Sequence, residues 1–278
     1  MTTPAGALFI DERLNQHLGK SSVDHAALAQ ATADLETYCR APIQQIAERY
    51  WTAPNAPADS SAASLLAFYQ TSSRYLYEST YTEGYTDHQR MARIVVKAIQ
   101  RWRKTPVLDF GGGGGGLTLA LAAHGLACEY ADVPGKLSEF VRWRLQHHGL
   151  AAPIYDATQS LPAGRYQAVL AIDVLEHVPD LVATLRQLKA ALAPRGWLLG
   201  THSFTEGDPL HLAASHQYGD LRRFDQLMQS EGFTYRGRLK ADPLSEQLYR
   251  LAHRPTVFHV RLDPKLKSGG TLLVYERC

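Results

Sequence analysis

The N-terminal part of the chain, 1–85, has apolar residues at irregular but helical spacing. Within 26–51 the helical pattern is interrupted by Pro42, so we expect two helices there rather than one. A polar link rich in proline, alanine and serine follows at 52–64, and a tyrosine-dense segment occupies 64–85. The pattern predicts a helical cap ahead of the main domain.

The pattern changes after this cap, because short apolar runs alternate with longer helical stretches. This alternation is typical of a parallel sheet with helices on both faces. A lead-in helix is predicted over 86–104. Strands are predicted at 105–110, 127–133, 152–157, 166–174, 196–204, 233–239 and 271–277, with helices at 117–125, 135–149, 179–192 and 220–232. The segment 240–269 holds a predicted helix, PLSEQLYRLA, and the strand-like run VFHVRL.

Composition and charge narrow the classes of function. The net charge of +2 is too small to indicate a nucleic-acid partner, and no Lys/Arg run marks a phosphate-binding surface. Cys39, Cys128 and Cys278 are far apart, which predicts neither a disulfide framework nor a metal site. There is no secretion signal, and no apolar stretch approaches the ~18 residues of a membrane helix. We therefore expect a cytoplasmic protein without a membrane partner.

The central feature is the apolar strand VLDF followed by six glycines, Gly111 to Gly116, and then an apolar helix. Glycines in a strand-to-helix turn let a ligand lie against bare backbone, and the helix start supplies free N–H groups. The alternative is a flexible linker, which is misplaced between an aliphatic strand and an apolar helix. The run predicts a ligand-binding turn.

A glycine turn alone fits nicotinamide, flavin and S-adenosylmethionine equally, so it does not identify the ligand. The acidic residues at the predicted strand ends separate these three possibilities better. Asp109 lies two residues before the first glycine, where it repels a pyrophosphate and suits a cationic ligand. Asp132 ends the second strand, where a carboxylate accepts both ribose hydroxyls. Asp156 ends the third strand within reach of an adenine amino group, and Asp173 ends the fourth. Each alone could be a helix cap or turn residue; together they predict one crevice.

These segments resemble the successive motifs of the class I S-adenosylmethionine-dependent methyltransferases over about residues 86–239. The motifs are VLDFGGGGGGLTLAL, EYADVPGKLSEFVRWRL, YDATQSLP and YQAVLAIDVLEHVPD. The resemblance implies an α/β, Rossmann-like sheet of seven strands, the last antiparallel, in an enzyme that uses S-adenosylmethionine. It implies a division into a helical lid, 1–85, and a cofactor-binding domain, 86–278.

The resemblance also assigns the cofactor site. It implies that the backbone of Gly111, Gly113 and Gly115 holds the methionine part, that Asp132 binds the ribose, that Val133 lies against the adenine, that Asp156 and Ala157 hold the adenine edge, and that Asp173 lies beside the sulfonium. This chain departs from the family in its glycine count, since the family usually varies two of these positions. We therefore expect a turn that is more mobile than usual.

Methyl transfer depends mainly on positioning, but a base is needed if the acceptor must lose a proton. His177, in LEHVPD, is the first candidate, because it follows the fourth strand and is expected to point into the crevice. The alternative role for His177 is to order its loop. His202, His211 and His216, after the fifth strand, are further candidates.

The tyrosines of the cap provide candidates for contact with the sulfonium. Helices N-terminal to the core often cover the cofactor in this family. We expect one or two of Tyr77, Tyr81 and Tyr85 to contact it, with a cation–π attraction of ~1–2 kcal/mol. Tyr69 and Tyr75 are expected to be core or interface aromatics. The aromatic region also suggests a homodimer surface.

The favoured function is methyl transfer to a small molecule of secondary metabolism. A second function is a reaction of S-adenosylmethionine with itself, because an aromatic cap on this core is similar to the azetidine-2-carboxylate synthases. In that reaction the α-amine attacks the γ-carbon and expels 5′-methylthioadenosine. A non-catalytic cofactor sensor is a third reading, and a nicotinamide-dependent enzyme is a fourth, against which Asp109 argues.

Overall fold

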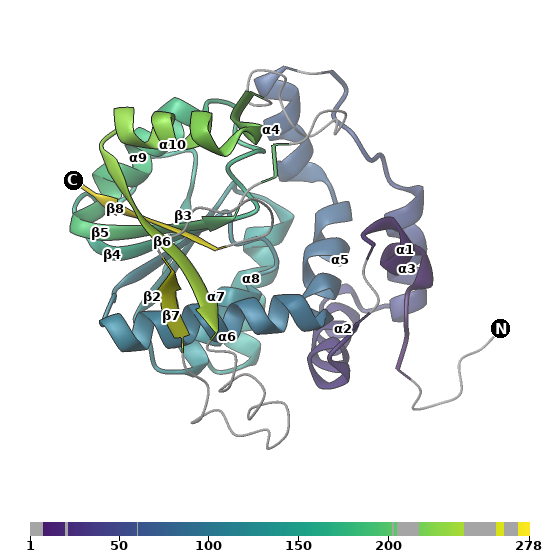
Figure 1. The fold of residues 1–278 in the computed structure, drawn as a ribbon. Coiled ribbons are helices and arrows are strands. Elements are labelled where there is room, and N and C mark those ends of the chain that lie inside the picture. Colours follow the sequence, from purple (N-terminus) through teal and green to yellow (C-terminus); the bar gives the residue numbers. More distant parts are fainter. Residues whose placement is uncertain are drawn as a thin grey trace.

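The structure is a computed structural model that describes residues 8–19, 22–59, 61–201, 203–204, 217–241, 260–263 and 272–278. An eight-stranded sheet forms its centre, and a group of N-terminal helices lies to one side of the sheet (Figure 1). The candidate bases His202, His211 and His216, and the helix predicted within PLSEQLYRLA, lie outside these ranges, so those predictions stay open.

The N-terminal group, called the cap below, comprises α1 to α5 and a short 3₁₀ helix, η1. Its bounds are α1 (Glu12–His17), α2 (His25–Cys39), α3 (Ile43–Thr52), α4 (Ala62–Thr71), α5 (Arg74–Tyr81) and η1 (Thr82–Gly84). Pro42 separates α2 from α3, which confirms the two predicted helices. The carboxylates of Asp11 and Asp24 accept hydrogen bonds from the first turns of α1 and α2, which stabilises both helix starts.

The sheet confirms the predicted fold class and adds one strand. Its strands are β1 (Val107–Phe110), β2 (Cys128–Asp132), β3 (Ile154–Asp156), β4 (Tyr166–Ile172), β5 (Leu192–Thr201), β6 (Phe233–Ala241), β7 (Val260–Asp263) and β8 (Leu273–Arg277). They lie in the order β3-β2-β1-β4-β5-β8-β6-β7. Strands β1 to β5 are parallel, and β8 inserts antiparallel between β5 and β6.

The additional strand is β7, which includes the end of the strand-like segment VFHVRL. It pairs antiparallel with the outer edge of β6, from Arg238 to Ala241. The expected count of seven strands is therefore too low. The reason is that β6 would otherwise present an unpaired edge of N–H and C=O groups, and β7 covers part of it.

Helices cover both faces of the sheet, as the alternation predicts. The helices are α6 (Thr86–Trp102), α7 (Gly116–Ala123), α8 (Lys136–His147), α9 (Leu181–Ala191) and α10 (Leu221–Ser230). Apolar side chains of α9 and α10 pack on the face that carries Leu108 and Phe110. Those of α6 and α7 pack on the opposite face with Val107, and α8 packs against Tyr130. Successive side chains of a strand point to opposite faces of the sheet, so Asp109 lies on the same face as Val107, the face covered by α7.

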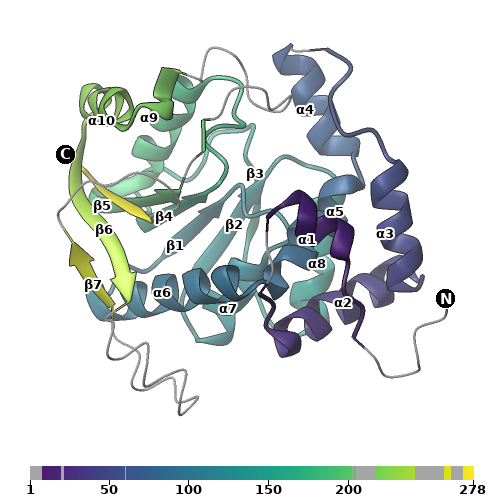
Figure 2. The same cartoon turned by 45° about the vertical axis from the view of Figure 1, so that its right-hand side comes forward.

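The cap has its own apolar core and joins the sheet domain through α8 (Figure 2). Leu28, Leu35 and Tyr50 are buried within it, and Leu137 and Phe140 of α8 belong to the same cluster. The cap is thereby fixed beside the carboxyl ends of β1 and β2, where α7 and α8 begin.

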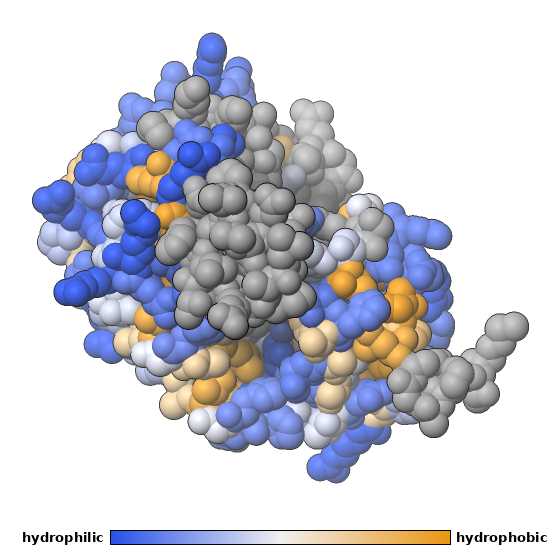
Figure 3. Space-filling view, turned by 60° about the horizontal axis from the view of Figure 1, so that its bottom comes forward, coloured by the Kyte–Doolittle hydropathy of each residue, from blue (hydrophilic) through white to orange (hydrophobic). Residues whose placement is uncertain are grey.

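Among the residues that carry a hydropathy colour in Figure 3, most are hydrophilic, and the apolar ones gather in a few small areas. Among the described residues, no helix has the length and apolar character needed to span a membrane. In the same part of the chain, no group of three or more His, Cys, Asp or Glu residues is arranged to hold a metal ion. The homodimer and the division at residue 85 stay predictions.

Candidate active site

A cavity of about 590 Å³ lies between the cap and the carboxyl ends of the parallel strands. We call its two sides the sheet wall and the cap wall. The sheet wall includes Asp109, Gly111–Gly114, Asp132, Val133, Ala157 and Asp173. The cap wall includes Leu65, Leu66, Tyr69, Tyr75, Ser79 and Glu83. The position outside the strand ends is where open α/β sheets bind their ligands.

The glycine run forms a tight turn between β1 and α7. Gly111, Gly113 and Gly115 have φ of 66°, 53° and 80°, values that residues with a Cβ rarely adopt. The turn is closed by a hydrogen bond from the Gly115 N–H to the Gly112 carbonyl, at 2.9 Å. Backbone N–H and C=O groups therefore lie directly against the cavity.

Side chains from three neighbouring positions hold this turn in place. The Tyr130 hydroxyl donates to the Gly113 carbonyl at 2.9 Å, and Arg144 donates to the Gly114 carbonyl at 2.6 Å. The Gly113 N–H donates to Asp132 Oδ2 at 3.0 Å. We expected a mobile turn from its glycine content. The structure supplies restraints from outside the glycine run, through Tyr130 and Arg144.

Asp109 is 2% exposed and receives a hydrogen bond of 2.6 Å from the Thr118 hydroxyl, near the start of α7. Burial raises its pKa to about 6, although the bond from Thr118 acts in the opposite direction. A buried carboxylate at the edge of a cavity favours an incoming positive charge, as expected for the ligand inferred from the sequence.

Asp132 ends β2 and also lines the cavity. Its Oδ1 accepts a hydrogen bond of 2.7 Å from the Val133 N–H, and burial raises its pKa to about 6. The backbone bonds to Val133 and Gly113 fix the plane of the carboxylate. The Tyr130 hydroxyl also lies 3.1 Å from its Oδ2. Because Asp132 lines the cavity, the acceptor capacity that is left on the carboxylate is available to hydroxyl groups of a ligand.

The other two predicted carboxylates have different surroundings. Asp173 lines the cavity, has an unusual φ of 49°, and accepts a hydrogen bond of 2.7 Å from the Thr201 hydroxyl. Asp156 does not line the cavity, and its Oδ1 accepts from Thr158 Oγ1 at 2.6 Å. The local turn after β3 thus binds the carboxylate that we placed at the adenine, although Ala157 reaches the cavity as expected.

His177 also lines the cavity, on the loop that follows β4. Its ring meets the Tyr69 ring edge-on, with 6.1 Å between the ring centroids. Its backbone N–H donates to the Val174 carbonyl at 3.0 Å, which shapes the loop. The structure therefore brings this candidate base to the same end of the cavity as Asp173. Its role in proton transfer stays a prediction.

The cap tyrosines divide between the cavity and the core of the cap. Tyr77 and Tyr81 are 1% and 0% exposed and lie outside the cavity lining. The Tyr77 hydroxyl donates to Asp11 Oδ2 at 2.8 Å, and the Tyr81 hydroxyl accepts from the Asp11 N–H at 2.7 Å. We expected one or two cofactor contacts from Tyr77, Tyr81 and Tyr85, and the first two have their rings in the core of the cap instead. Their helix, α5, packs there against α2 and α3.

Tyr69 and Tyr75, which we expected to be core or interface aromatics, line the cavity instead. On α5, Tyr75 lies about 200° around the helix from Tyr77, so the two rings point to opposite sides. Tyr85 has both properties, since it lines the cavity while its hydroxyl donates to Asn15 Oδ1 at 2.9 Å. Of the three tyrosines predicted to contact the cofactor, Tyr85 is therefore the one that lines the cavity, and that contact stays a prediction.

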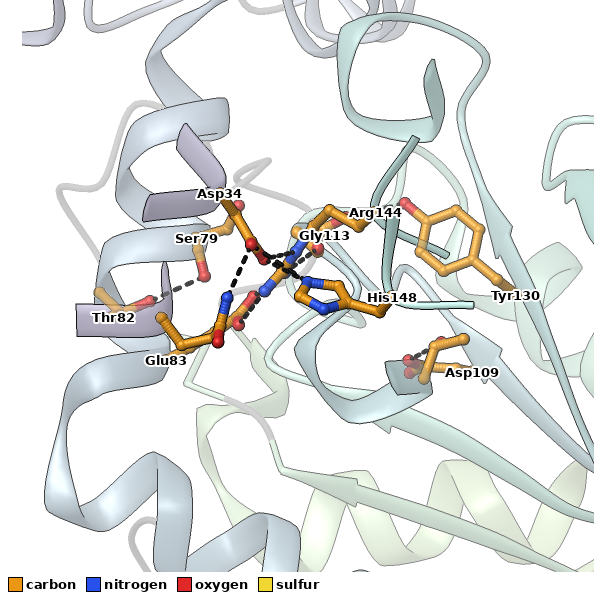
Figure 4. Close-up of polar contacts among 12 residues, drawn as sticks. Asp34, Ser79, Thr82, Glu83, Asp109, Gly113, Tyr130, Arg144 and His148 are labelled. Atoms are coloured by element: carbon orange, nitrogen blue, oxygen red, sulfur yellow. Dashed lines mark hydrogen bonds and ion pairs between the residues drawn. The ribbon is translucent and has the colours of Figure 1, made fainter. Parts of the chain in front are cut away.

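Arg144 of α8 is the main site residue that our sequence reasoning missed (Figure 4). It is 3% exposed and donates to Asp34 Oδ2 at 2.8 Å and to Glu83 Oε1 at 2.7 Å. His148 Nε2 lies 3.0 Å from Asp34 Oδ2. Burial lowers the Arg144 pKa, but the two carboxylates raise it more, so the net pKa is above its usual value. One signal was available, because Arg144 shares a helix face with Phe140 and Leu137.

The fold and the site together define an S-adenosylmethionine-binding protein of the Rossmann-like class. The family described as "Methyltransferase domain" matches residues 81–236, which is more than half of the chain. The chain belongs to this family, within the class I superfamily whose cofactor is S-adenosylmethionine. The match begins at Tyr81, the last residue of α5.

Curated relatives match a shorter part of the chain. The ubiquinone biosynthesis O-methyltransferase of Bordetella avium is 33% identical over 100 residues, which cover 33% of this chain and 40% of that protein. The protein of the same name from Paramagnetospirillum magneticum is 34% identical over 96 residues, covering 34% of this chain and 39% of that protein. The chain thus matches less than half the length of these relatives.

Solved structures with a similar arrangement include two methyltransferases. Magnesium protoporphyrin IX methyltransferase from Synechocystis PCC 6803 with bound SAM has a TM-score of 0.46 and 20% identity, over 69% of this chain and 80% of that chain. The CurJ carbon methyltransferase has a TM-score of 0.48 and 18% identity, over 73% of this chain and 59% of that chain.

Proposed function

We propose that this chain transfers the methyl group of S-adenosylmethionine to a small-molecule acceptor bound in the same cavity. One observation carries the proposal: a single cavity combines the bare glycine turn, the acidic strand ends and an aromatic cap wall. When bound, S-adenosylmethionine supplies a methyl group on a positively charged sulfur. The residues of the chain then have to bind the cofactor and the acceptor, orient them toward each other and keep water out of the cavity.

Each wall has a separate task in this proposal. The backbone of the turn and the Asp132 carboxylate hold the methionine and ribose parts of the cofactor, and Val133 and Ala157 hold the adenine. Tyr69, with its ring beside His177, covers the end near Asp173 and shields it from water. A positioned acceptor attacks in line with the carbon–sulfur bond, so positioning supplies most of the rate. His177 is placed to take the proton that the acceptor loses.

The acceptor is proposed at the level of its chemical class. Among the described residues, the cavity is lined by the acidic residues Glu78, Glu83, Asp109, Asp132 and Asp173, and by no Lys or Arg. This lining favours a neutral or cationic acceptor over an anionic one. The names of the curated relatives support an oxygen nucleophile as the first class to try. An acceptor from secondary metabolism stays a prediction.

The test uses the purified full chain with methyl-labelled S-adenosylmethionine and a small-molecule extract that contains phenols and amines. We expect label in a small product, together with S-adenosylhomocysteine. Label in protein or RNA would contradict the proposal. The Asp132→Ala variant is the control, and it should lose the labelled product because the ribose loses its acceptor.

A second candidate is the cyclisation of S-adenosylmethionine, and the same acidic lining favours it because the lining suits a cation as sole substrate. The neutral α-amine attacks the γ-carbon, the bond between that carbon and sulfur breaks, and 5′-methylthioadenosine leaves. The amine then loses one proton, for which His177 is the nearest candidate base. With S-adenosylmethionine alone, stoichiometric 5′-methylthioadenosine supports this candidate. Its absence, with S-adenosylhomocysteine formed only when an acceptor is added, excludes it.

A further inference from the structure

Glu83 fills the space that two of the glycines leave open. It belongs to η1, at the end of the cap, and lines the cavity. A Cβ added at Gly116 would lie 2.5 Å from Glu83 Cδ, and one added at Gly114 would lie 2.8 Å from Thr80 Oγ1 and 3.0 Å from Glu83 Oε1. Neither of these glycines has a positive φ. At these two positions of the run, side chains at the end of the cap, the Glu83 carboxylate among them, therefore pack directly against the turn.

Arg144 fixes the orientation of this carboxylate. Its Nη1 donates to Glu83 Oε1 at 2.7 Å and its Nη2 donates to Glu83 Oε2 at 2.9 Å, a bidentate arrangement (Figure 4). The same guanidinium donates to Asp34, so one cation faces two carboxylates. The Asp34 and Glu83 carboxylates carry one more charge than the Arg144 guanidinium balances. Asp34 has a side chain only 1% exposed, whereas that of Glu83 is 17% exposed, so the accessible part of this charge lies on Glu83.

Three consecutive carbonyl groups of the turn already have donors. The Gly112 carbonyl accepts from the Gly115 N–H, the Gly113 carbonyl from Tyr130, and the Gly114 carbonyl from Arg144. An ammonium group that enters this end of the cavity therefore finds its strongest acceptors on side chains rather than on the turn. A hydrogen bond to a carboxylate is also stronger than one to a neutral carbonyl.

We propose that Glu83 binds the α-ammonium group of the methionine part of S-adenosylmethionine, and that Arg144 is a positioning residue that aims its carboxylate. The cap would then contribute a cofactor ligand as well as covering the cavity. This inference rests on the proposed function, since it requires S-adenosylmethionine in this cavity. It differs from the assignment made from the sequence, in which the glycine backbone alone holds the methionine part.

The test compares two ligands by calorimetry with the full chain: S-adenosylhomocysteine, and its analogue with hydrogen in place of the α-amino group. For the wild type, we expect the loss of the ammonium to weaken binding about 10- to 100-fold, the range for a charge-assisted hydrogen bond. Glu83→Gln should weaken S-adenosylhomocysteine by a similar factor and change the deaminated analogue by less than about threefold.

Two control variants separate this role from a structural one. Glu48→Gln removes an exposed acid of the cap that pairs with Arg13 outside the cavity lining, and should change neither affinity by more than about threefold. Asp132→Ala should weaken both ligands by the same factor, because both contain the ribose. Equal weakening of both ligands by Glu83→Gln would show that Glu83 only shapes the turn, and would overturn the inference.

If Glu83→Gln does not fold, the two-ligand comparison on the wild type decides the question. Equal affinities for S-adenosylhomocysteine and its deaminated analogue would overturn the inference, because no acceptor would then depend on the ammonium. A wild-type chain that binds neither S-adenosylmethionine nor S-adenosylhomocysteine would contradict the proposed function itself. These results distinguish a failed role for Glu83 from a failed cofactor assignment.

Discussion

The sheet wall and the cap wall enclose the same cavity, but different physical causes place their residues. On the sheet wall, Asp109, Asp132 and Asp173 lie at or just beyond strand ends, and the parallel topology brings those ends to one edge. On the cap wall, the residues lie on helices, and any side of a helix can face the cavity. The comparison teaches that strand ends predict a site better than helical aromatic clusters do.

Arg144 connects the cap wall to the sheet wall, and we expect its replacement to give the largest effect on stability. Arg144→Met leaves the buried Asp34 and Glu83 carboxylates without their cation, so we expect a loss of about 3–5 kcal/mol in the free energy of unfolding, measured by urea denaturation. The control is Arg13→Met, which removes an ion pair to Glu48 whose side chains are 51% and 62% exposed. That variant should lose at most about 1 kcal/mol. Similar losses in both variants would mean that the two walls are joined elsewhere.

The two faces of the tyrosine cluster should respond differently. Tyr69→Leu removes a ring from the cap wall, and we expect it to weaken S-adenosylmethionine about threefold to tenfold more than the uncharged-sulfur product, by loss of a cation–π contact. Tyr77→Phe removes the bond to Asp11 and should lower the free energy of unfolding by about 1 kcal/mol without changing either affinity. Calorimetry and urea denaturation measure these effects. A larger affinity effect from Tyr77 would restore the assignment made from the sequence.

Asp109 of the sheet wall should make the free energy of unfolding depend on pH. The folded-state pKa of Asp109, about 6, lies above its ordinary value of 3.8. Between these values the folded chain binds more protons than the unfolded chain, so this group makes the protein more stable as the pH falls through 6. We expect the wild type to gain roughly 1 kcal/mol more than Asp109→Asn between pH 7.5 and pH 5, measured by denaturation at each pH. Parallel pH profiles would contradict this assignment.

Much of the fold was predictable because it depends on local patterns. A proline inside a helical pattern predicts a break, and Pro42 is the N-cap of α3. Short apolar runs bounded by glycine are likewise recognised as strands from the local sequence. The edge strand β7 was recognised only as strand-like, because its pairing depends on how far β6 extends. Asp156 was placed at the adenine on its strand-end position, but the Thr158 hydroxyl two residues later binds its carboxylate.

The sequence by itself determined the glycine turn, the acidic strand ends and the family to which the chain belongs, because each lies in a continuous segment whose spacing carries the signal. Only the tertiary structure decided that Tyr69 and Tyr75 line the cavity while Tyr77 and Tyr81 do not, since packing against α2 and α3 selects the buried side of α5. It also decided that Arg144 joins Asp34 and Glu83, which lie 110 and 61 residues away from it. Contacts over such separations depend on how whole helices pack, and no local pattern records them.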